Sequence, residues 1–307
     1  MTFASLTAFT KVVEEGGFAA AARRLGLSRA QVNKLVIALE NRLGVALLNR
    51  TTRKVAATPA GRAFYERARA ILNDLAEAEA AVRDDGEEPR GDLKINAPMS
   101  FGTMHLAPAL ADFMLRHPQI RVQLVLNDRF VDPIAEGYDV TVRIAGPIAL
   151  PSLVDHRIVE VKRVICAAPA LLRARGEPRA PQDLTTAPCL HYGALPSGNV
   201  WRLAGPAGPV DVRVNGVLCS NNGEVLRDAA LKGLGFALLP TFIVGAELRA
   251  GRLVTVLDAH QPPRLFLTVL YPPHRHLSAR IRLLVAFFYE RFGESPSWDV
   301  LATQVAQ

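Results

Sequence analysis

The sequence is poor in cysteine and has no long apolar run. Its 307 residues include three cysteines, Cys166, Cys189 and Cys219, and none of them stands in a Cys-x-x-Cys or other metal-ligand spacing. We therefore expect small buried hydrophobes in a reducing compartment. The N-terminal segment has charged residues by Glu14 and lacks the apolar core of a signal peptide, and no window approaches the roughly twenty apolar residues of a membrane span. The sequence predicts a cytoplasmic protein without a membrane segment.

Signatures of catalysis are also missing. The chain has no Gly-x-Ser-x-Gly turn, no phosphate-binding loop and no His-Glu-x-x-His motif. Gly233-Leu234-Gly235 lacks the third glycine of a nucleotide fingerprint, so we interpret it as the end of a helix and the start of a strand. His274-Arg275-His276 has no cysteine or carboxylate nearby in sequence, which favours exposure to solvent over metal binding. We expect neither an enzyme, nor a cofactor, nor a metal site.

Length and composition indicate more than one folded unit. A chain of 307 residues, half of them hydrophobic, exceeds the usual size of one domain and can bury substantial cores, which excludes a disordered protein. Residues 84–91 are polar, charged and interrupted by glycine and proline. This composition predicts a domain boundary.

The stretch after residue 17 has the pattern of a helix-turn-helix. A helix with an apolar face at Phe3, Leu6, Phe9 and Val13 precedes it, and Gly16-Gly17 ends that helix. The next apolar stripe, followed by a turn at Gly26, consists of Phe18, Ala21, Ala22 and Leu25. Three helices with apolar faces predict a small helical core.

The second helix of the pair begins at a capping box. Ser28 and Gln31 have the spacing at which a serine hydroxyl and a glutamine amide satisfy each other's backbone N–H groups. The positions expected to face inward are Val32, Leu35, Val36, Leu39 and Leu43. The outer face is short, polar and basic, which suits the edges of bases, and consists of Arg29, Ala30, Asn33, Lys34 and Ile37.

Positive charge is concentrated in the same region. Between Arg23 and Arg69 eleven Lys or Arg residues stand against Glu40 and Glu66, a net charge of +9, whereas the whole chain has +7. The rest of the chain therefore has a net charge of −2. A basic segment of this kind is what phosphate binding requires. Together with the capped helix pair, it predicts binding to double-stranded DNA.

A wing and a long helix follow. Two short strands, 45–48 and 55–58, are predicted around the basic turn 50–54, whose tip would contact phosphates or enter a minor groove. Thr58 and Pro59 suit the N-cap and first position of a helix that meets no breaker before Gly86. A narrow heptad seam on this helix predicts dimerisation, with packing on its own domain as the alternative; the seam is Phe64, Ala68, Ile71, Leu75, Ala78 and Val82.

Beyond residue 91 strands and helices alternate. The predicted strands are 93–96, 122–126, 140–144, 164–168, 189–192, 200–203, 210–217, 236–239 and 265–271. The predicted helices are 103–116, 131–136, 169–175, 222–232 and 278–292. This alternation predicts two α/β units with a mostly parallel sheet.

The N-terminal motifs resemble those of one family. The segments 18–25, 39–40, 43–44, 47–50 and 58–61, together with Ser28, are similar to the signature of LysR-type transcriptional regulators, and the order and length of the later segments also match. Gly17 stands where the family usually has a capping serine, a departure that costs only a few tenths of a kcal/mol. Asn33 stands where serine is common, and its amide can pair with adenine in two places. We therefore expect the operator to differ from those of relatives.

The resemblance implies a multidomain architecture. It consists of an all-α, winged helix-turn-helix domain (1–58), a linker and dimerisation helix (59–85), a hinge (86–91) and a two-lobed α/β effector domain of the periplasmic-binding-protein type 2 kind (92–307). Lobe I comprises about 92–162 and 265–307, and lobe II about 163–264. The return of the chain to lobe I near residue 265 comes from the resemblance alone. The DNA-binding residues would be Ser28, Arg29, Ala30, Asn33, Lys34, Arg50, Arg53 and Lys54.

A small effector, of carboxylate type by resemblance, would bind between the lobes. In open α/β sheets ligands bind beyond the carboxyl ends of strands and against helix N-termini. This rule selects Met99, Ser100, Phe101, Asn127, Arg143, Tyr192, Asn221 and Asn222. Purely structural roles are open for several of them: Ser100 and the two asparagines as helix caps, and Arg143 as a salt bridge between lobes. Trp201 is expected in the core rather than in the wall of the site.

The predicted function is effector-controlled transcription regulation. Expected partners are operator DNA, the effector, a second copy of the chain in a homodimer or homotetramer, and RNA polymerase as a further candidate. The competing hypothesis is an α/β enzyme that processes a metabolite and has an appended helix-turn-helix. An architectural DNA protein is a third alternative, and the large two-lobed domain makes it the weakest.

Overall fold

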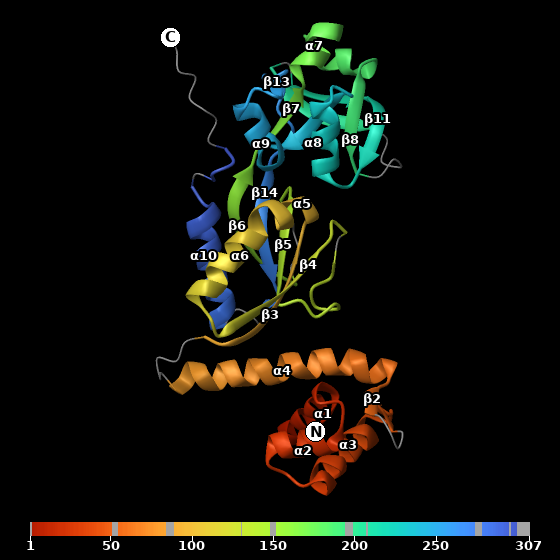
Figure 1. Ribbon diagram of the computed structural model, residues 1–307, viewed down its shortest axis with the longest axis vertical. Helices are drawn as coiled ribbons and strands as arrows, with labels where there is room; N and C mark the ends of the chain where they lie inside the picture. The colour runs from red at the N-terminus through yellow and green to blue at the C-terminus, as the bar shows by residue number, and fades with distance from the viewer. Residues whose placement is uncertain are drawn as a thin grey trace. The chain divides into compact units, whose positions relative to one another are not determined.

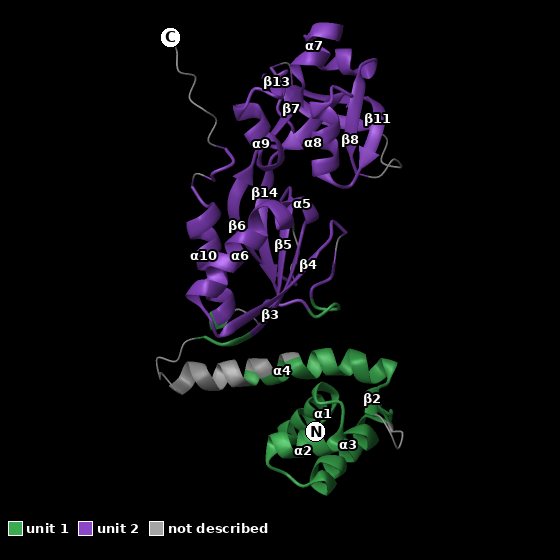
Figure 2. Ribbon diagram, viewed as in Figure 1, with its two compact units in different colours: residues 1–91, 134–137, 277–279 green, residues 92–133, 138–276, 280–307 purple. Residues whose placement is uncertain are grey.

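The computed structural model describes residues 2–50, 55–83, 89–129, 131–147, 152–193, 199–206, 208–273, 278–294 and 296–299. The chain forms two compact units, distinguished in Figure 2: residues 1–91 with the segments 134–137 and 277–279, and the remainder. The predicted wing tip at 51–54, part of the predicted hinge at 86–88, and His274 and His276 lie outside the described residues.

Three helices build the N-terminal core, as predicted (Figure 1). They are α1 (Phe3–Glu14), α2 (Phe18–Leu25) and α3 (Arg29–Leu43). The predicted capping box starts α3: the Gln31 N–H donates to Ser28 Oγ at 3.2 Å, and the Ser28 N–H donates to Gln31 Oε1 at 2.8 Å. Gly26 ends α2 with a φ of 66°, a left-handed conformation that favours glycine.

The inner face of α3 matches the prediction except at its end. Val32, Val36 and Leu39 are buried, and Leu35 is partly buried against the same core. Leu43 was predicted to face inward, but 39% of its surface is exposed. The prediction was wrong there: Leu43 is the last residue of α3 and is not part of the core cluster, which the chain rejoins at Leu47.

A two-stranded wing follows α3. It consists of β1 (Leu48–Arg50) and β2 (Val55–Ala57), paired antiparallel with Leu48 opposite Ala57. The first strand begins three residues later than predicted. Glu40 explains the shift, because its Oε1 accepts hydrogen bonds from the N–H groups of Leu47 (2.8 Å) and Leu48 (3.1 Å) and fixes the segment before the strand.

The long helix α4 (Pro59–Arg83) starts where the sequence predicts. Thr58 Oγ1 accepts a hydrogen bond from the Gly61 N–H at 2.9 Å and caps the helix. A Cβ at Gly61 would lie 1.9 Å from the Leu47 carbonyl oxygen, so only glycine fits where α4 passes the Leu47 backbone. The helix therefore leaves the wing at a position fixed by backbone contact.

The predicted dimer seam along α4 needs a correction at its start. The ring of Phe64 lies 5.6 Å from that of Phe9, and Ala68 is fully buried in the N-terminal core. These two residues pack on their own domain, which was the alternative to a dimer seam, Ala68 completely and Phe64 in part. Ile71 is 44% exposed. The side chains of Ala78 and Val82 lie outside the described residues.

Lobe I has a five-stranded sheet in the order β4-β3-β5-β14-β6. The strands are β3 (Gly91–Ala97), β4 (Ile120–Leu126), β5 (Val140–Ala145), β6 (Val154–Val161) and β14 (Leu265–Tyr271). The helical segments are α5 (Met99–Phe101), a π-helical turn (Gly102–Leu106), α6 (Ala107–Arg116) and α10 (Ala279–Phe292). Helices α6 and α10 lie side by side, joined by the Arg116–Glu290 and Arg291–Asp112 ion pairs (Figure 1).

Lobe II has a second five-stranded sheet in the order β11-β8-β12-β7-β13. Its strands are β7 (Arg163–Ala167), β8 (Pro188–Tyr192), β11 (Asn215–Ser220), β12 (Phe236–Pro240) and β13 (Val254–Val256). A separate hairpin comprises β9 (Val200–Gly205) and β10 (Gly208–Arg213). The helices are α7 (Pro169–Arg175), a 3₁₀ segment (Pro181–Thr185), α8 (Gly223–Leu231) and α9 (Thr241–Arg249).

Both large sheets are mixed, so the prediction of a mostly parallel sheet was wrong. Strand β3 runs parallel to β5, and β8 runs parallel to β11 and β12, but β14 is antiparallel to β5 and β6, and β7 is antiparallel to β12 and β13. The cause is the double crossing: the chain leaves lobe I after β6 and returns through β14, which runs the opposite way beside it.

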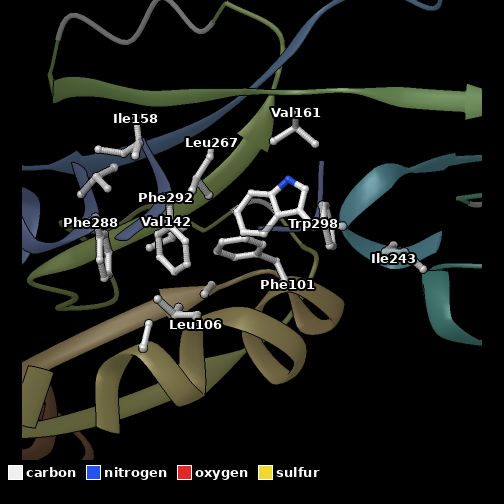
Figure 3. Packing of buried hydrophobic residues seen from close by; sticks show 14 of the residues in the cluster. Phe101, Leu106, Val142, Ile158, Val161, Ile243, Leu267, Phe288, Phe292 and Trp298 are labelled. Carbon is white, nitrogen blue, oxygen red and sulfur yellow. The ribbon is translucent and has the colours of Figure 1, made fainter. Parts of the chain in front are cut away.

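Several predicted elements differ from those observed. Residues 133–137 form turns instead of the predicted helix, and the Tyr138 N–H donates to the Pro133 carbonyl at 2.9 Å to close them. The predicted strand 210–217 is divided between β10 and β11, and β6 and α9 were not predicted. The core of the second unit draws on both lobes: Figure 3 shows Phe101 of lobe I beside Trp298, with Ile243 of lobe II nearby.

Candidate functional site

The N-terminal half of α3 presents a polar and basic face. Ser28, Arg29, Ala30 and Lys34 are exposed, and Asn33 is partly exposed. Val32 and Val36, on the opposite side of the helix, are fully buried. Packing of the inner face therefore fixes which side chains reach outward. The side chain of Arg50 and all of Arg53 and Lys54 lie outside the described residues.

A cavity of about 560 Å³ lies between the two lobes of the second unit. Its walls come from the carboxyl ends of strands in both lobes and from the segments that cross between them. The lining residues are Pro98, Ser100, Phe101, Asp128, Arg143, Ile144, Arg163, His191, Tyr192, Val200, Trp201, Arg202, Leu238, Pro240, Phe242, Ile243, Pro263 and Leu265. The site is thus an apolar chamber with a few charged groups, the usual character of a small-molecule pocket.

The structure brings four of the eight predicted effector residues to this cavity. Ser100, Phe101, Arg143 and Tyr192 line it. Trp201, expected in the core, is 4% exposed within the lobe II cluster and also lines the cavity. Strand ends of both lobes therefore contribute residues to one cavity.

The other four predicted residues are not among those lining the cavity. The Met99 N–H donates to Asp128 Oδ1 at 3.1 Å, and the Asn127 N–H donates to the Ala97 carbonyl at 3.0 Å. Asn222 Oδ1 caps α8 by accepting from the N–H groups of the next two helical residues, at 3.0 and 3.1 Å, and Asn221 is exposed. For Asn222 the structural alternative, a helix cap, is therefore the observed role.

The strand-end rule also points to Asp128, which follows β4 and lines the cavity. Sequence reasoning missed four other polar or aromatic residues of the lining, which are Arg163, His191, Arg202 and Phe242. His191 adjoins Tyr192, which that rule selected. Phe242 belongs to α9, which the pattern did not predict. Arg163 begins the second lobe at a crossing that no local signal marks.

Arg143 is held within lobe I. It is 8% exposed, and its guanidinium donates to Asn96 Oδ1 at 2.6 Å, to the Arg129 carbonyl at 3.1 Å and to the Val142 carbonyl at 3.2 Å. These bonds orient a buried cation toward the cavity. They also give it a structural anchor in its own lobe, rather than the predicted alternative of a bridge between lobes.

Arg163 brings a second guanidinium from the start of lobe II. Its Nη2 donates to the Pro263 carbonyl at 2.8 Å, and its Nε has no hydrogen-bond partner among the described residues. Burial lowers the pKa of this guanidinium, although an arginine stays charged near neutral pH. A partly buried cation of this kind is stabilised by an anionic partner.

The other polar groups of the cavity include a tyrosine, a histidine, an aspartate and a third arginine. Burial, and secondarily the charge of Asp128, raises the pKa of Tyr192 to about 12, so its hydroxyl is a hydrogen-bond donor at neutral pH. Burial lowers the pKa of His191, which favours the neutral imidazole. Three arginines and one aspartate line the cavity. Cations therefore exceed anions along the lining of the cavity.

Metal binding and membrane insertion find no support in the described part of the chain. No group of three or more His, Cys, Asp or Glu residues there is placed to hold a metal ion. Within the same residues, none of the helices combines the length and the apolar character that crossing a bilayer requires.

A winged helix-turn-helix unit, followed by a long helix and a two-lobed unit with a cavity, defines an effector-controlled transcriptional regulator. The model of the bacterial regulatory helix-turn-helix protein, lysR family, matches residues 3–62, and that of the LysR substrate binding domain matches residues 86–293. The chain belongs to the LysR family of transcriptional regulators. It is therefore a regulator and not an enzyme, which overturns the competing hypothesis.

Relatives and solved structures agree over nearly the whole chain. The HTH-type transcriptional regulator DmlR of Escherichia coli K12 is 36% identical over 94% of each chain, and the transcriptional activator TtdR of Escherichia coli UTI89 is 32% identical over 94% of each. The structure of CrgA, a LysR-type regulator from Neisseria meningitidis, is 30% identical, with a TM-score of 0.61 over 93% of this chain and 97% of CrgA. Full-length AphB from Vibrio cholerae is 28% identical, with a TM-score of 0.59 over 94% and 99%.

Proposed function

We propose that this LysR-type regulator acts in the cytoplasm as a homodimer or homotetramer whose hold on operator DNA is controlled by a small carboxylate between its lobes. The observation that carries the effector assignment is a pair of guanidiniums on one cavity, the buried Arg143 from lobe I and the partly buried Arg163 from lobe II. RNA polymerase is a further candidate partner.

Operator reading is assigned to the outer face of α3. Arg29, Ala30, Asn33 and Lys34 would contact base edges, and Ser28, whose hydroxyl caps the helix, would lie beside the backbone. Arg50, Arg53 and Lys54 would hold phosphates along the wing. The capped helix supports this assignment because its first turn, where base contacts are usually made in this motif, is rigidly defined.

Pairing is assigned to the part of α4 beyond the N-terminal core. Ile71 is 44% exposed on a helix of 25 residues, which leaves an apolar side chain in water unless a partner covers it. Leu75, Ala78 and Val82 would continue the seam. Two DNA-binding domains linked in this way could then read operator half-sites that lie about one helical turn of DNA, or a multiple of it, apart.

The effector assignment follows from charge and shape together. A carboxylate would pair with Arg163, whose Nε has no partner among the described residues, and would be oriented by the anchored guanidinium of Arg143. Phe101, Trp201 and Phe242 supply apolar walls for its carbon skeleton. A bound molecule that contacts both lobes would alter their geometry and so the spacing or bending of the DNA contacts.

The DNA assignment is tested by charge removal on the full-length protein. Lys34→Ala and Arg53→Ala should weaken binding to a promoter fragment in a gel-shift assay at physiological salt while leaving the melting temperature nearly unchanged. Lys232→Ala, an exposed lysine at the C-cap of α8, removes the same charge from the other unit and should not weaken binding. If Lys34→Ala and Arg53→Ala both kept the wild-type affinity for the promoter fragment, the DNA-binding site would lie elsewhere.

The effector assignment is tested by ligand-induced stabilisation. Full-length protein is melted with a panel of small mono- and dicarboxylates and with matched amides or alcohols, and consumption of each acid is followed in parallel. We expect stabilisation by acids without turnover, and its loss in Arg163→Gln but not in Arg175→Gln, which removes an exposed arginine from the last turn of α7, away from the cavity lining. Stabilisation by the neutral analogues alone would contradict a carboxylate site.

A further inference from the structure

Trp298, near the C-terminal end of the described chain, packs against both lobes. It is 4% exposed, and its ring lies 5.8 Å from Phe101, 4.7 Å from His105 and 5.7 Å from Phe292, all in lobe I. On the other side its ring lies 6.3 Å from Phe242 of lobe II. Figure 3 shows the indole beside Phe101, with Ile243 of lobe II nearby. One side chain after α10 therefore contacts aromatic groups of both lobes.

The backbone at Trp298 and the next side chain attach the same segment to lobe II. The Trp298 carbonyl accepts a hydrogen bond from Arg249 Nη1 at 3.3 Å, and a Cβ at Gly245 would lie 2.5 Å from that oxygen, so glycine in α9 permits the approach. Asp299 Oδ1 accepts from Thr241 Oγ1 at 2.5 Å. Asp299 Oδ2 lies 3.5 Å from Lys162 Nζ, on the first crossing between the lobes.

The aromatic contacts of Trp298 lie directly behind the effector cavity. Phe101 and Phe242 both line that cavity, one from each lobe, and both touch the indole. His105, whose ring is in edge contact with Trp298, hydrogen-bonds through Nε2 to the Phe242 carbonyl at 2.9 Å, which adds a direct link between lobes at the same place. A relative movement of the lobes cannot leave these contacts unchanged.

We propose that Trp298 and Asp299 are positioning residues of the effector cavity: they form a clasp, residues 296–299, that holds its two walls at a fixed separation from behind. The clasp adds a non-covalent connection between the lobes to the two covalent crossings at 161–163 and 262–265. An effector that changes the lobe geometry must work against it. The inference rests on the proposed function only in treating the cavity as the effector site.

The clasp is tested by measuring the distance between the lobes without ligand or DNA. Spin labels are placed on Leu115→Cys in α6, where the native residue is 82% exposed, and on Arg173→Cys in α7, in a Cys219→Ser background that leaves only the buried cysteines. The full-length protein should give a narrow distance distribution. Trp298→Ala should broaden or displace it, Asp299→Ala should do so more weakly, and Trp298→Phe, which keeps an aromatic ring, should restore the narrow distribution.

Matched controls separate positioning from a general loss of stability. Tyr289→Ala truncates a 43% exposed aromatic residue on α10 and should leave the distribution narrow. A Trp298→Ala protein that melts at a lower temperature but keeps the wild-type distance distribution would overturn the clasp. If Trp298→Ala does not fold, an unchanged distance distribution in Asp299→Ala would overturn it instead. Because the measurement needs no ligand, failure of the acid panel to stabilise the protein would count against the effector site and not against the clasp.

Discussion

Ser100 Oγ accepts a hydrogen bond from the backbone N–H of Gly223 at 3.2 Å. This bond joins the turn after β3 in lobe I to the first residue of α8 in lobe II, beside the effector cavity. A Cβ on Gly223 would lie 2.3 Å from Ile243 Cδ1, so glycine lets α8 begin close to α9 within lobe II. The serine that the sequence suggested as a helix cap instead satisfies the N-terminus of a helix in the other lobe.

Removal of this hydroxyl should loosen the contact between the lobes. Ser100→Ala leaves the buried Gly223 N–H without its acceptor, and we expect a loss of about 1–2 kcal/mol in the free energy of unfolding of the effector unit. Thr255→Ala is the control, because it removes a hydroxyl that bonds Asp258 at an exposed site. Equal effects of the two changes in urea titrations would contradict a special role for Ser100.

Two glycine substitutions in the winged unit should have opposite signs. Gly61→Ala would force a Cβ to within 1.9 Å of the Leu47 carbonyl oxygen, and relief of that overlap should cost about 1–3 kcal/mol. Gly17 is the N-cap of α2 in an extended conformation, has open space around its Cα and makes no side-chain cap. Gly17→Ser should therefore stabilise the unit by a few tenths of a kcal/mol. Thermal melts of both variants test the two expectations. A Gly61→Ala protein as stable as the wild type would contradict the close contact between Gly61 and the Leu47 carbonyl.

Stability of the effector unit should fall on the acid side of neutrality. Burial lowers the pKa of His105, and its hydrogen bond to the Phe242 carbonyl only partly opposes this; burial also lowers the pKa of His191. A lowered folded-state pKa means that the unfolded chain binds protons first, so the stabilisation is present above the unfolded value of about 6.5 and is lost as pH falls through the folded value.

The measurement is urea unfolding between pH 8 and pH 5. His105→Gln keeps an N–H donor for the Phe242 carbonyl but does not titrate, so its stability should decline less steeply below pH ~6.5 than that of the wild type. His191→Gln should flatten the same curve independently. If neither variant changes the slope, these histidines do not control the acid transition.

The cysteines should differ sharply in reactivity. Burial raises the pKa of Cys166 and of Cys189 to about 12, so neither forms a thiolate near neutral pH. Cys219 is only partly buried. A thiol-reactive maleimide at pH 7.5 should therefore modify at most Cys219 in the folded protein and all three after denaturation, with mass spectrometry locating the adducts. Rapid labelling of Cys166 in the native protein would contradict its burial.

The amino-acid sequence by itself determined the winged helix-turn-helix domain of this protein. The capping box at Ser28, the turn at Gly26 and the start of α4 at Thr58 depend on contacts within a few residues, so spacing alone reveals them. Alternation of strands and helices likewise indicated the α/β unit. Its mixed sheets did not follow from that pattern, because strand direction depends on where the chain crosses between lobes.

Only the tertiary structure decided the composition of the cavity and the clasp behind it. Arg143 and Tyr192 could be found because they stand at strand ends, whereas Arg163, Phe242 and Trp298 come from distant segments and meet only after both lobes have formed. The same holds for Phe64 and Ala68, whose heptad spacing fits a partner helix but which pack against α1 and the N-terminal core. Periodicity shows which face of a helix is apolar, and folding determines what covers that face.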